Sequence, residues 1–111
     1  MTLLTSNGKK DFAETNRDSF IAGKKTVTVA GIGEQLPSNA VPQGFPLVIK
    51  ALAGNTAKVH VAKSKALVEV DASAYELVAG ESIGLFVTNT DKIWIDVNTS
   101  GEGVTYSVET D

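Results

Sequence analysis

The stretch FPLVIKALAGNTAKVHVA, residues 45–62, decides the fold that we expect for this chain. Its first part, residues 45–52, is apolar except for Lys50, and the turn cluster AGNT at 53–56 separates it from a β-branched run at 58–62. Such runs on either side of a short loop that contains Gly and Asn are typical of a β-hairpin. The sequence therefore predicts that the two runs are neighbouring antiparallel strands.

Alternation along the two runs predicts which side chains face the core, because successive strand residues point to opposite faces. The uncharged set of the first run is expected to face the core: Phe45, Leu47, Ile49 and Ala51. Lys50 marks the other face, which we expect to meet solvent or a partner. On the second run, Val59 and Val61 are expected to point inward and His60 outward.

Length and composition limit the classes of protein to consider. The chain has 111 residues, enough for one domain, and it has no cysteine, which excludes disulfides and thiolate chemistry. Its net charge of −3 argues against the basic face that nucleic-acid binding requires. No apolar run has the length of a signal peptide or a membrane span. We expect a soluble protein that binds neither nucleic acid nor a membrane and is made and used without secretion.

Residues 1–25 are expected to form an extended N-terminal arm, because their apolar residues show no sustained periodicity. A short helix over residues 11–20, capped by Asp11, is an alternative. The arm is either a free terminus or a segment that orders against a partner. In the second case we expect contacts at Phe12, Phe20, Ile21, Lys24 and Lys25. Deleting the arm is expected to leave the domain folded but to weaken binding to the partner.

Residues 26–111 are expected to form the domain proper. Strand patterns separated by turn signals recur at 26–30, 45–52, 58–62, 66–70, 82–88, 92–97 and 104–108, and residues 34–36 can resume the pairing of the first of them. Residues 75–78 lead into the turn at 79–81. The glycines of the GIG segment at 31–33 predict a bend or bulge. The pattern predicts an all-β fold, an antiparallel β-sandwich or jelly-roll-like barrel of about seven or eight short strands.

Trp94 is the largest side chain of the chain and lies on the outward phase of its predicted strand. Alternation over residues 92–97 assigns Ile93, Ile95 and Val97 to the core and leaves Trp94 and Asp96 outside. An outward tryptophan is a frequent anchor of protein interfaces, and the alternative is that it covers the rim of the core. We expect Trp94 to be an interface residue.

A characteristic order of turns and strands runs from residue 26 to residue 109. It consists of the segments LPS at 36–38, VPQG at 41–44, VIKAL at 48–52, NT at 55–56, VHV at 59–61, LVAGES at 77–82, NTDKIWID at 89–96 and GEGVTY at 101–106. This order resembles that of small virion proteins of tailed bacteriophages, which are β-sandwich head decoration (cement) proteins or head-fibre bases. Family members often have glycine where this chain has Ala62 and Glu76. The resemblance implies a structural role as a homotrimer on a capsid lattice, and it identifies no contact residues.

The residues that could carry chemistry are few and scattered. His60 is the only histidine, so a multi-histidine metal centre or a histidine relay is excluded. Ser82 and Ser107 lack a nucleophile motif, and the GIG segment lacks the strand–loop–helix context of a dinucleotide site. Four carboxylates leave a hydrolytic or calcium site as the weaker alternative: Glu69 with Asp71, and Glu76 with Glu81. We expect no catalytic residues, no cofactor and no metal.

Together these observations predict a non-enzymatic structural virion protein. The expected protein binds the outside of a phage head as a homotrimer, contacts the major capsid protein and stabilises the shell. It would be made in the cytoplasm of the bacterial host. The alternative is a carbohydrate- or receptor-binding module of a head fibre or tail, which would present aromatic residues on loops beside amides and acids. A third possibility is a cellular adhesion or scaffold domain.

Overall fold

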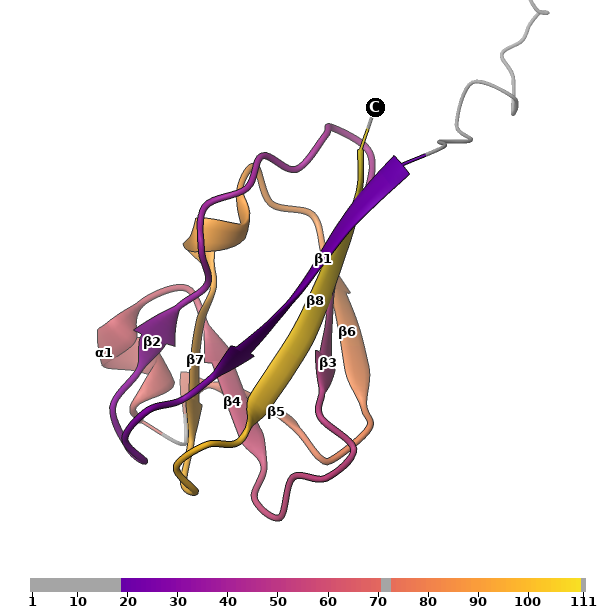
Figure 1. Ribbon diagram of the computed structural model, residues 1–111. Helices are drawn as coiled ribbons and strands as arrows, with labels where there is room; N and C mark the ends of the chain where they lie inside the picture. Colours follow the sequence, from indigo (N-terminus) through magenta and orange to yellow (C-terminus); the bar gives the residue numbers. More distant parts are fainter. Residues whose placement is uncertain (1–18, 71–72, 111) are drawn as a thin grey trace, which may run out of the picture.

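Two antiparallel four-stranded sheets form the fold in the computed structural model, which describes residues 19–70 and 73–110 (Figure 1). The first sheet has the order β1 (Ser19–Thr26), β8 (Gly103–Thr110), β3 (Leu47–Ala51) and β6 (Ser82–Leu85). The second has the order β2 (Glu34–Gln35), β7 (Trp94–Val97), β4 (Val59–Ala62) and β5 (Tyr75–Leu77). The expected all-β antiparallel sandwich is therefore confirmed.

The core lies between the inward faces of the two sheets. On β3, burial alternates as expected, with Leu47, Ile49 and Ala51 inside and the intervening Val48 and Lys50 exposed. Ile95 and Val97 on β7, which were predicted to point inward, are buried, and so are Val104, Tyr106 and Val108 on β8. Alternation with one apolar face is sufficient to fix these positions, because a shift of one residue would bury polar side chains.

The predicted hairpin at residues 45–62 is wrong, because its two strands belong to different sheets. β3 pairs with β6 and β8, whereas β4 pairs with β5 and β7. The connecting loop is held against the turn that precedes β8. The Asn55 side chain donates to the Gly103 carbonyl at 2.9 Å, and the Glu102 carboxylate accepts from the backbone N–H of Thr56 and Ala57 at 2.8 and 3.0 Å. These bonds stabilise a crossing between the sheets instead of a tight turn.

The boundary placed after residue 25 is also wrong, because Ser19–Thr26 is a strand of the first sheet. β1 pairs with β8 along eight residues, from Ser19 opposite Thr110 to Thr26 opposite Gly103. Its composition hides this role, since lysines and Gly23 interrupt the apolar pattern. Gly23 is needed there, because a Cβ at this position would lie 2.5 Å from the Tyr106 ring. Residues 1–18, including Phe12 and most of the alternative helix at 11–20, lie outside the described residues.

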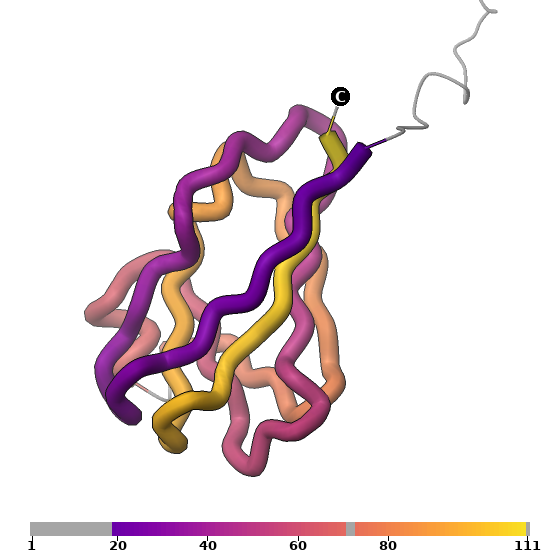
Figure 2. Tube along the Cα trace, in the orientation of Figure 1, coloured from indigo at the N-terminus to yellow at the C-terminus, as the bar shows by residue number. Residues whose placement is uncertain are grey.

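Both described ends of the chain meet at one corner of the sandwich. Figure 2 shows β1 and the C-terminal strand running side by side to that corner. The Ser19 and Thr110 hydroxyls are 3.1 Å apart and form a hydrogen bond. A segment attached before Ser19 therefore starts beside the C-terminus.

The predicted strand at 66–70 is wrong, because this segment contains the short helix α1 (Lys65–Val68). The Ser64 hydroxyl caps it by accepting from the Leu67 N–H at 3.2 Å, and Lys65 binds Glu69 one turn later at 2.7 Å. α1 packs on the outer side of the second sheet against β4 and β7. The apolar run had suggested a strand, but only Val68 of the helix is buried.

The remaining connections agree with the turn signals. Gly31 has φ of +86° in the predicted bend, which is the left-handed region that glycine adopts without strain. β6 ends at Leu85, earlier than expected, and a 3₁₀ turn, η3 (Thr90–Lys92), precedes β7. Within the described residues, no helix is both long and apolar enough to cross a membrane.

Candidate functional site

The predicted interface residues do not form one patch. Phe20 and Lys24 lie exposed on β1, with Phe20 66% exposed, whereas Ile21 packs against the core from the other side of the strand. Lys25 is half-buried and Trp94 belongs to the second sheet. Phe12 lies outside the described residues. The structure thus brings four of the six residues onto one strand but divides them between its two faces.

The outer face of the first sheet, meaning the side turned away from the core, carries mostly small side chains and two lysines in two neighbouring rows. One row across the four strands reads Ala22, Ser107, Val48 and Gly84, and the next reads Lys24, Thr105, Lys50 and Ser82. A shallow hollow of about 240 Å³ lies over both rows. Such a face lets another surface approach closely, and its two lysines attract carboxylates.

The outer face of the second sheet carries Trp94 but is partly covered by α1. Trp94 lies in register between Gln35 and Ala62 and is half-buried. The neighbouring row contains Asp96 and His60, each only 3% exposed. The expectation that these two side chains point to solvent is therefore wrong. They do have the outward phase, but α1 packs over β4 and β7 on this side.

The buried polar row beneath α1 forms contacts within the fold. His60 Nε2 lies 3.1 Å from Glu76 Oε2, and the hydrogen bonds from His60 and Lys58 lower the pKa of the Glu76 carboxyl. Asp96 accepts from the Gly31 N–H at 3.1 Å, but its burial raises the pKa of this carboxyl. In residues 19–70 and 73–110, no group of His, Asp and Glu side chains is arranged to hold a metal ion.

The other carboxylates considered from the sequence also serve the fold. Glu69 accepts from the Gly33 N–H and from Lys65, both at 2.7 Å, and these two bonds lower the pKa of its carboxyl. Glu81 accepts from the Val78 N–H at 2.8 Å within its own turn. Asp71 lies outside the described residues. The pairs suggested for a hydrolytic or calcium site are thus engaged separately wherever the structure describes them.

An ion pair closes one side of the sandwich, where the edge strands β1 and β2 meet. Lys25 Nζ lies 2.8 Å from Glu34 Oε1, and the other carboxylate oxygen accepts from the Thr28 N–H. The bond from Lys25, followed by that from Thr28, lowers the pKa of the Glu34 carboxyl. Lys25 therefore joins the two sheets within the subunit instead of being free for a partner.

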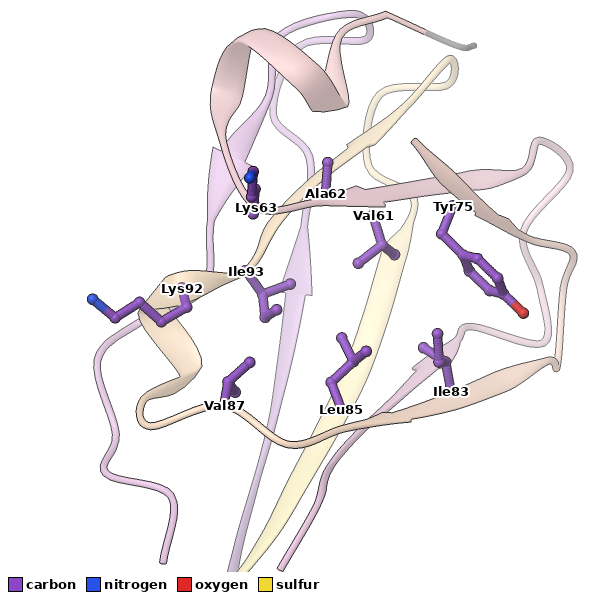
Figure 3. Close-up of a pocket in the computed structure, with 9 residues that line it drawn as sticks. All are labelled: Val61, Ala62, Lys63, Tyr75, Ile83, Leu85, Val87, Lys92 and Ile93. Atoms are coloured by element: carbon purple, nitrogen blue, oxygen red, sulfur yellow. The ribbon is translucent and has the colours of Figure 1, made fainter. Parts of the chain in front are cut away.

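The opposite side of the sandwich, between the edge strands β5 and β6, is open. A groove of about 350 Å³ lies there, which we call the edge groove (Figure 3). Its apolar centre is formed by Val61, Ile83, Leu85, Val87 and Ile93, with Tyr75 at one end and Ala62, Lys63 and Lys92 at the other. No pattern in the sequence indicates the groove, because alternation assigns its apolar residues to the core without showing where the sheets separate.

Comparisons with known proteins returned no match: no family model, no curated protein and no solved structure is similar to this chain.

Proposed function

We propose that this chain is a non-enzymatic structural subunit of a phage particle, a decoration protein that binds the outside of the head as a homotrimer. Its partners would be two further copies of itself and the major capsid protein. The resemblance in sequence to small virion proteins supports this proposal, and so does the size of the sandwich. The carboxylates and the histidine described above are engaged in contacts within the fold, which is in keeping with a role in binding.

The observation that carries the proposal is the amount of aromatic surface that a single subunit leaves in solvent. Phe20, Tyr75 and Phe86 are 66%, 57% and 74% exposed. Aromatic side chains are enriched in protein interfaces relative to the rest of the surface, where they act as anchors. The three residues lie on β1, on β5 and directly after β6, so more than one edge of the sandwich is available for contact. A subunit that binds both its own copies and a shell needs several such surfaces.

Imaging of purified particles with and without this protein tests the proposal. We expect three-fold density on the outside of the head that is lost when the protein is absent, and heads that break at lower temperature without it. Isolated monomeric knobs would contradict the trimer, and particles that lack the protein altogether would contradict the virion role.

A second candidate function, glycan or receptor binding, is favoured by a hollow of about 340 Å³ beside Phe86. Its lining combines the exposed Phe86 ring with the Gln43 amide and the Thr88 hydroxyl. An aromatic platform beside hydrogen-bonding groups suits a sugar ring. Phe86→Ala should abolish binding to a glycan array if this function is correct, whereas an array that is blank for the unsubstituted protein argues against it.

A further inference from the structure

The edge groove has an apolar centre that the subunit itself leaves half open. Val61 and Ile93 form a buried floor, 5% and 4% exposed. Ile83, Leu85 and Val87 pack against the core yet are only half-buried, because they face the space between β5 and β6. Figure 3 shows these side chains converging on that space. The groove is therefore suited to a large apolar side chain supplied from outside.

Positive charge lies at one end of the groove. Lys63 and Lys92 are exposed there, and neither makes an ion pair with any described residue. In Figure 3 the Lys92 side chain extends outward, with its ammonium at the end farthest from the apolar centre. An apolar residue with carboxylates beside it would complement this arrangement, since the ring would fill the centre while the acids meet the lysines.

The N-terminal segment contains such a sequence. Residues 1–18 precede β1, and Phe12 is their only aromatic residue. It lies in the tetrapeptide DFAE at 11–14, directly after Asp11 and two residues before Glu14. The charge pattern of this tetrapeptide is opposite to that of the groove.

The position of Ser19 favours a groove on another copy. β1 and β6 are opposite edges of the first sheet, so about 14 Å of sheet separates them. Seven residues join Phe12 to Ser19 and reach at most about 24 Å. To enter its own groove the segment would have to pass around the end of the sandwich, where the β2–β3 connection crosses (Figure 1). A ring that joins opposite sides of the sandwich would place the β1 side of one subunit against the β5–β6 side of the next.

We infer that residues 11–14 of one copy dock in the edge groove of a neighbouring copy, with Phe12 in the apolar centre and the acids on Lys63 and Lys92. The contact is heterologous, with different surfaces on the two subunits, and contacts of this kind close cyclic assemblies. The inference rests on the proposed self-association and names the site and the segment through which it occurs.

Cross-linking between copies tests the inference in the full chain, which has no cysteine of its own. Copies with Ala13→Cys and copies with Ala62→Cys are co-expressed under different tags and treated with a short bis-maleimide. We expect a cross-linked dimer that carries both tags. The matched control replaces Ala62→Cys by Ala53→Cys, which lies exposed in the turn after β3 and away from the groove. It should give no such dimer.

Two further variants test the chemistry of the contact. Phe12→Ala should reduce the yield of the cross-link by about tenfold or more, as the loss of an interface anchor does. Lys63→Glu should also reduce it, and Glu14→Lys in the partner copy should restore it. Thermal melting of each variant shows that the domain is folded, so a lost cross-link reports the contact.

Several outcomes would overturn the inference. One is a cross-link of equal yield with Ala53→Cys, and another is a cross-link that forms only within a chain carrying both Ala13→Cys and Ala62→Cys. A trimer by light scattering that gives no cross-link would overturn the docking and leave the proposed homotrimer intact. A monomer at every concentration would overturn both.

Discussion

Gly33 determines how closely α1 approaches the second sheet. A Cβ at this position would lie 2.6 Å from Val68 Cγ1, and the Gly33 N–H donates to Glu69 just after the helix. Gly33→Ala should therefore displace α1 and lower the free energy of unfolding by about 1–3 kcal/mol. Chemical denaturation measures this loss.

Gly54→Ala is the matched control, because a Cβ there has open space and the residue lies in an exposed turn. Its effect should stay within about 0.5 kcal/mol. Equal losses for the two variants would mean that Gly33 acts through its backbone freedom and that α1 does not press on it.

For single residues, the sequence predicts the direction in which a side chain points better than it predicts whether the side chain is buried. Alternation placed Ile49 and Val97 inside correctly because the apolar phase of each strand is unbroken. It also assigned His60 and Asp96 the right phase, yet both are buried. Their burial depends on α1, a helix from another part of the chain, and no pattern within β4 or β7 reports what covers their outer side.

The Lys25–Glu34 ion pair links two edge strands and should make the stability of the sandwich depend on pH. Because the pKa of Glu34 is lowered in the folded protein, the pair contributes fully above the ordinary pKa of a glutamate and is lost as the pH falls through the lowered value. Glu34→Gln should cost about 1 kcal/mol at pH 7. The cost should disappear at a pH low enough to protonate the Glu34 carboxyl in both the folded and the unfolded protein. Urea unfolding of the two proteins across this range checks the prediction, and a difference that persists at the lowest pH would contradict it.

Truncation distinguishes the N-terminal segment from the strand that follows it. Removing residues 1–18 leaves β1 and its eight pairs with β8 intact, so the melting temperature should change by less than about 2 °C. Removing residues 1–26 deletes a whole strand together with Lys25 and should unfold the domain. Circular dichroism melts of both truncations measure the difference. If the shorter truncation also unfolds the protein, residues 1–18 belong to the core.

Elements were predictable where turn chemistry and periodicity agree, as they do for β3, β7 and β8. They were not predictable where pairing depends on distant segments. The loop at 53–56 has the composition of a hairpin turn, but Glu102 and Gly103 bind it from the far end of the chain. For β1, the partner β8 supplies the apolar contacts, so eight residues that include two lysines and a glycine form a strand that local propensity does not favour.

For the whole molecule, we predict that Trp94 contributes more to assembly than to the fold of one subunit. The side chain is half-buried, on a strand that α1 contacts, and retains surface for a subunit or capsid contact. Trp94→Ala should weaken assembly by about 2 kcal/mol, as interface anchors do, and should lower the melting temperature of the subunit only slightly. Light scattering at micromolar concentration and binding to particles that lack the protein measure assembly.

Val29→Ala is the control, because Val29 is an exposed residue in the bend after β1. A large loss of subunit stability with assembly intact would place Trp94 in the fold.

The pairing of Ser19 with Thr110 at one corner has a mechanical consequence. A force that separates the two ends of the chain would peel β1 from β8 starting at that corner, so that the pairs break one after another. A force that pulls Ser19 along the axis of β1, away from the body of the sandwich, loads all eight pairs in shear at the same moment. A subunit held through its N-terminal segment would carry tension as shear along β1. This is the direction of loading in which a β-ladder resists rupture most strongly.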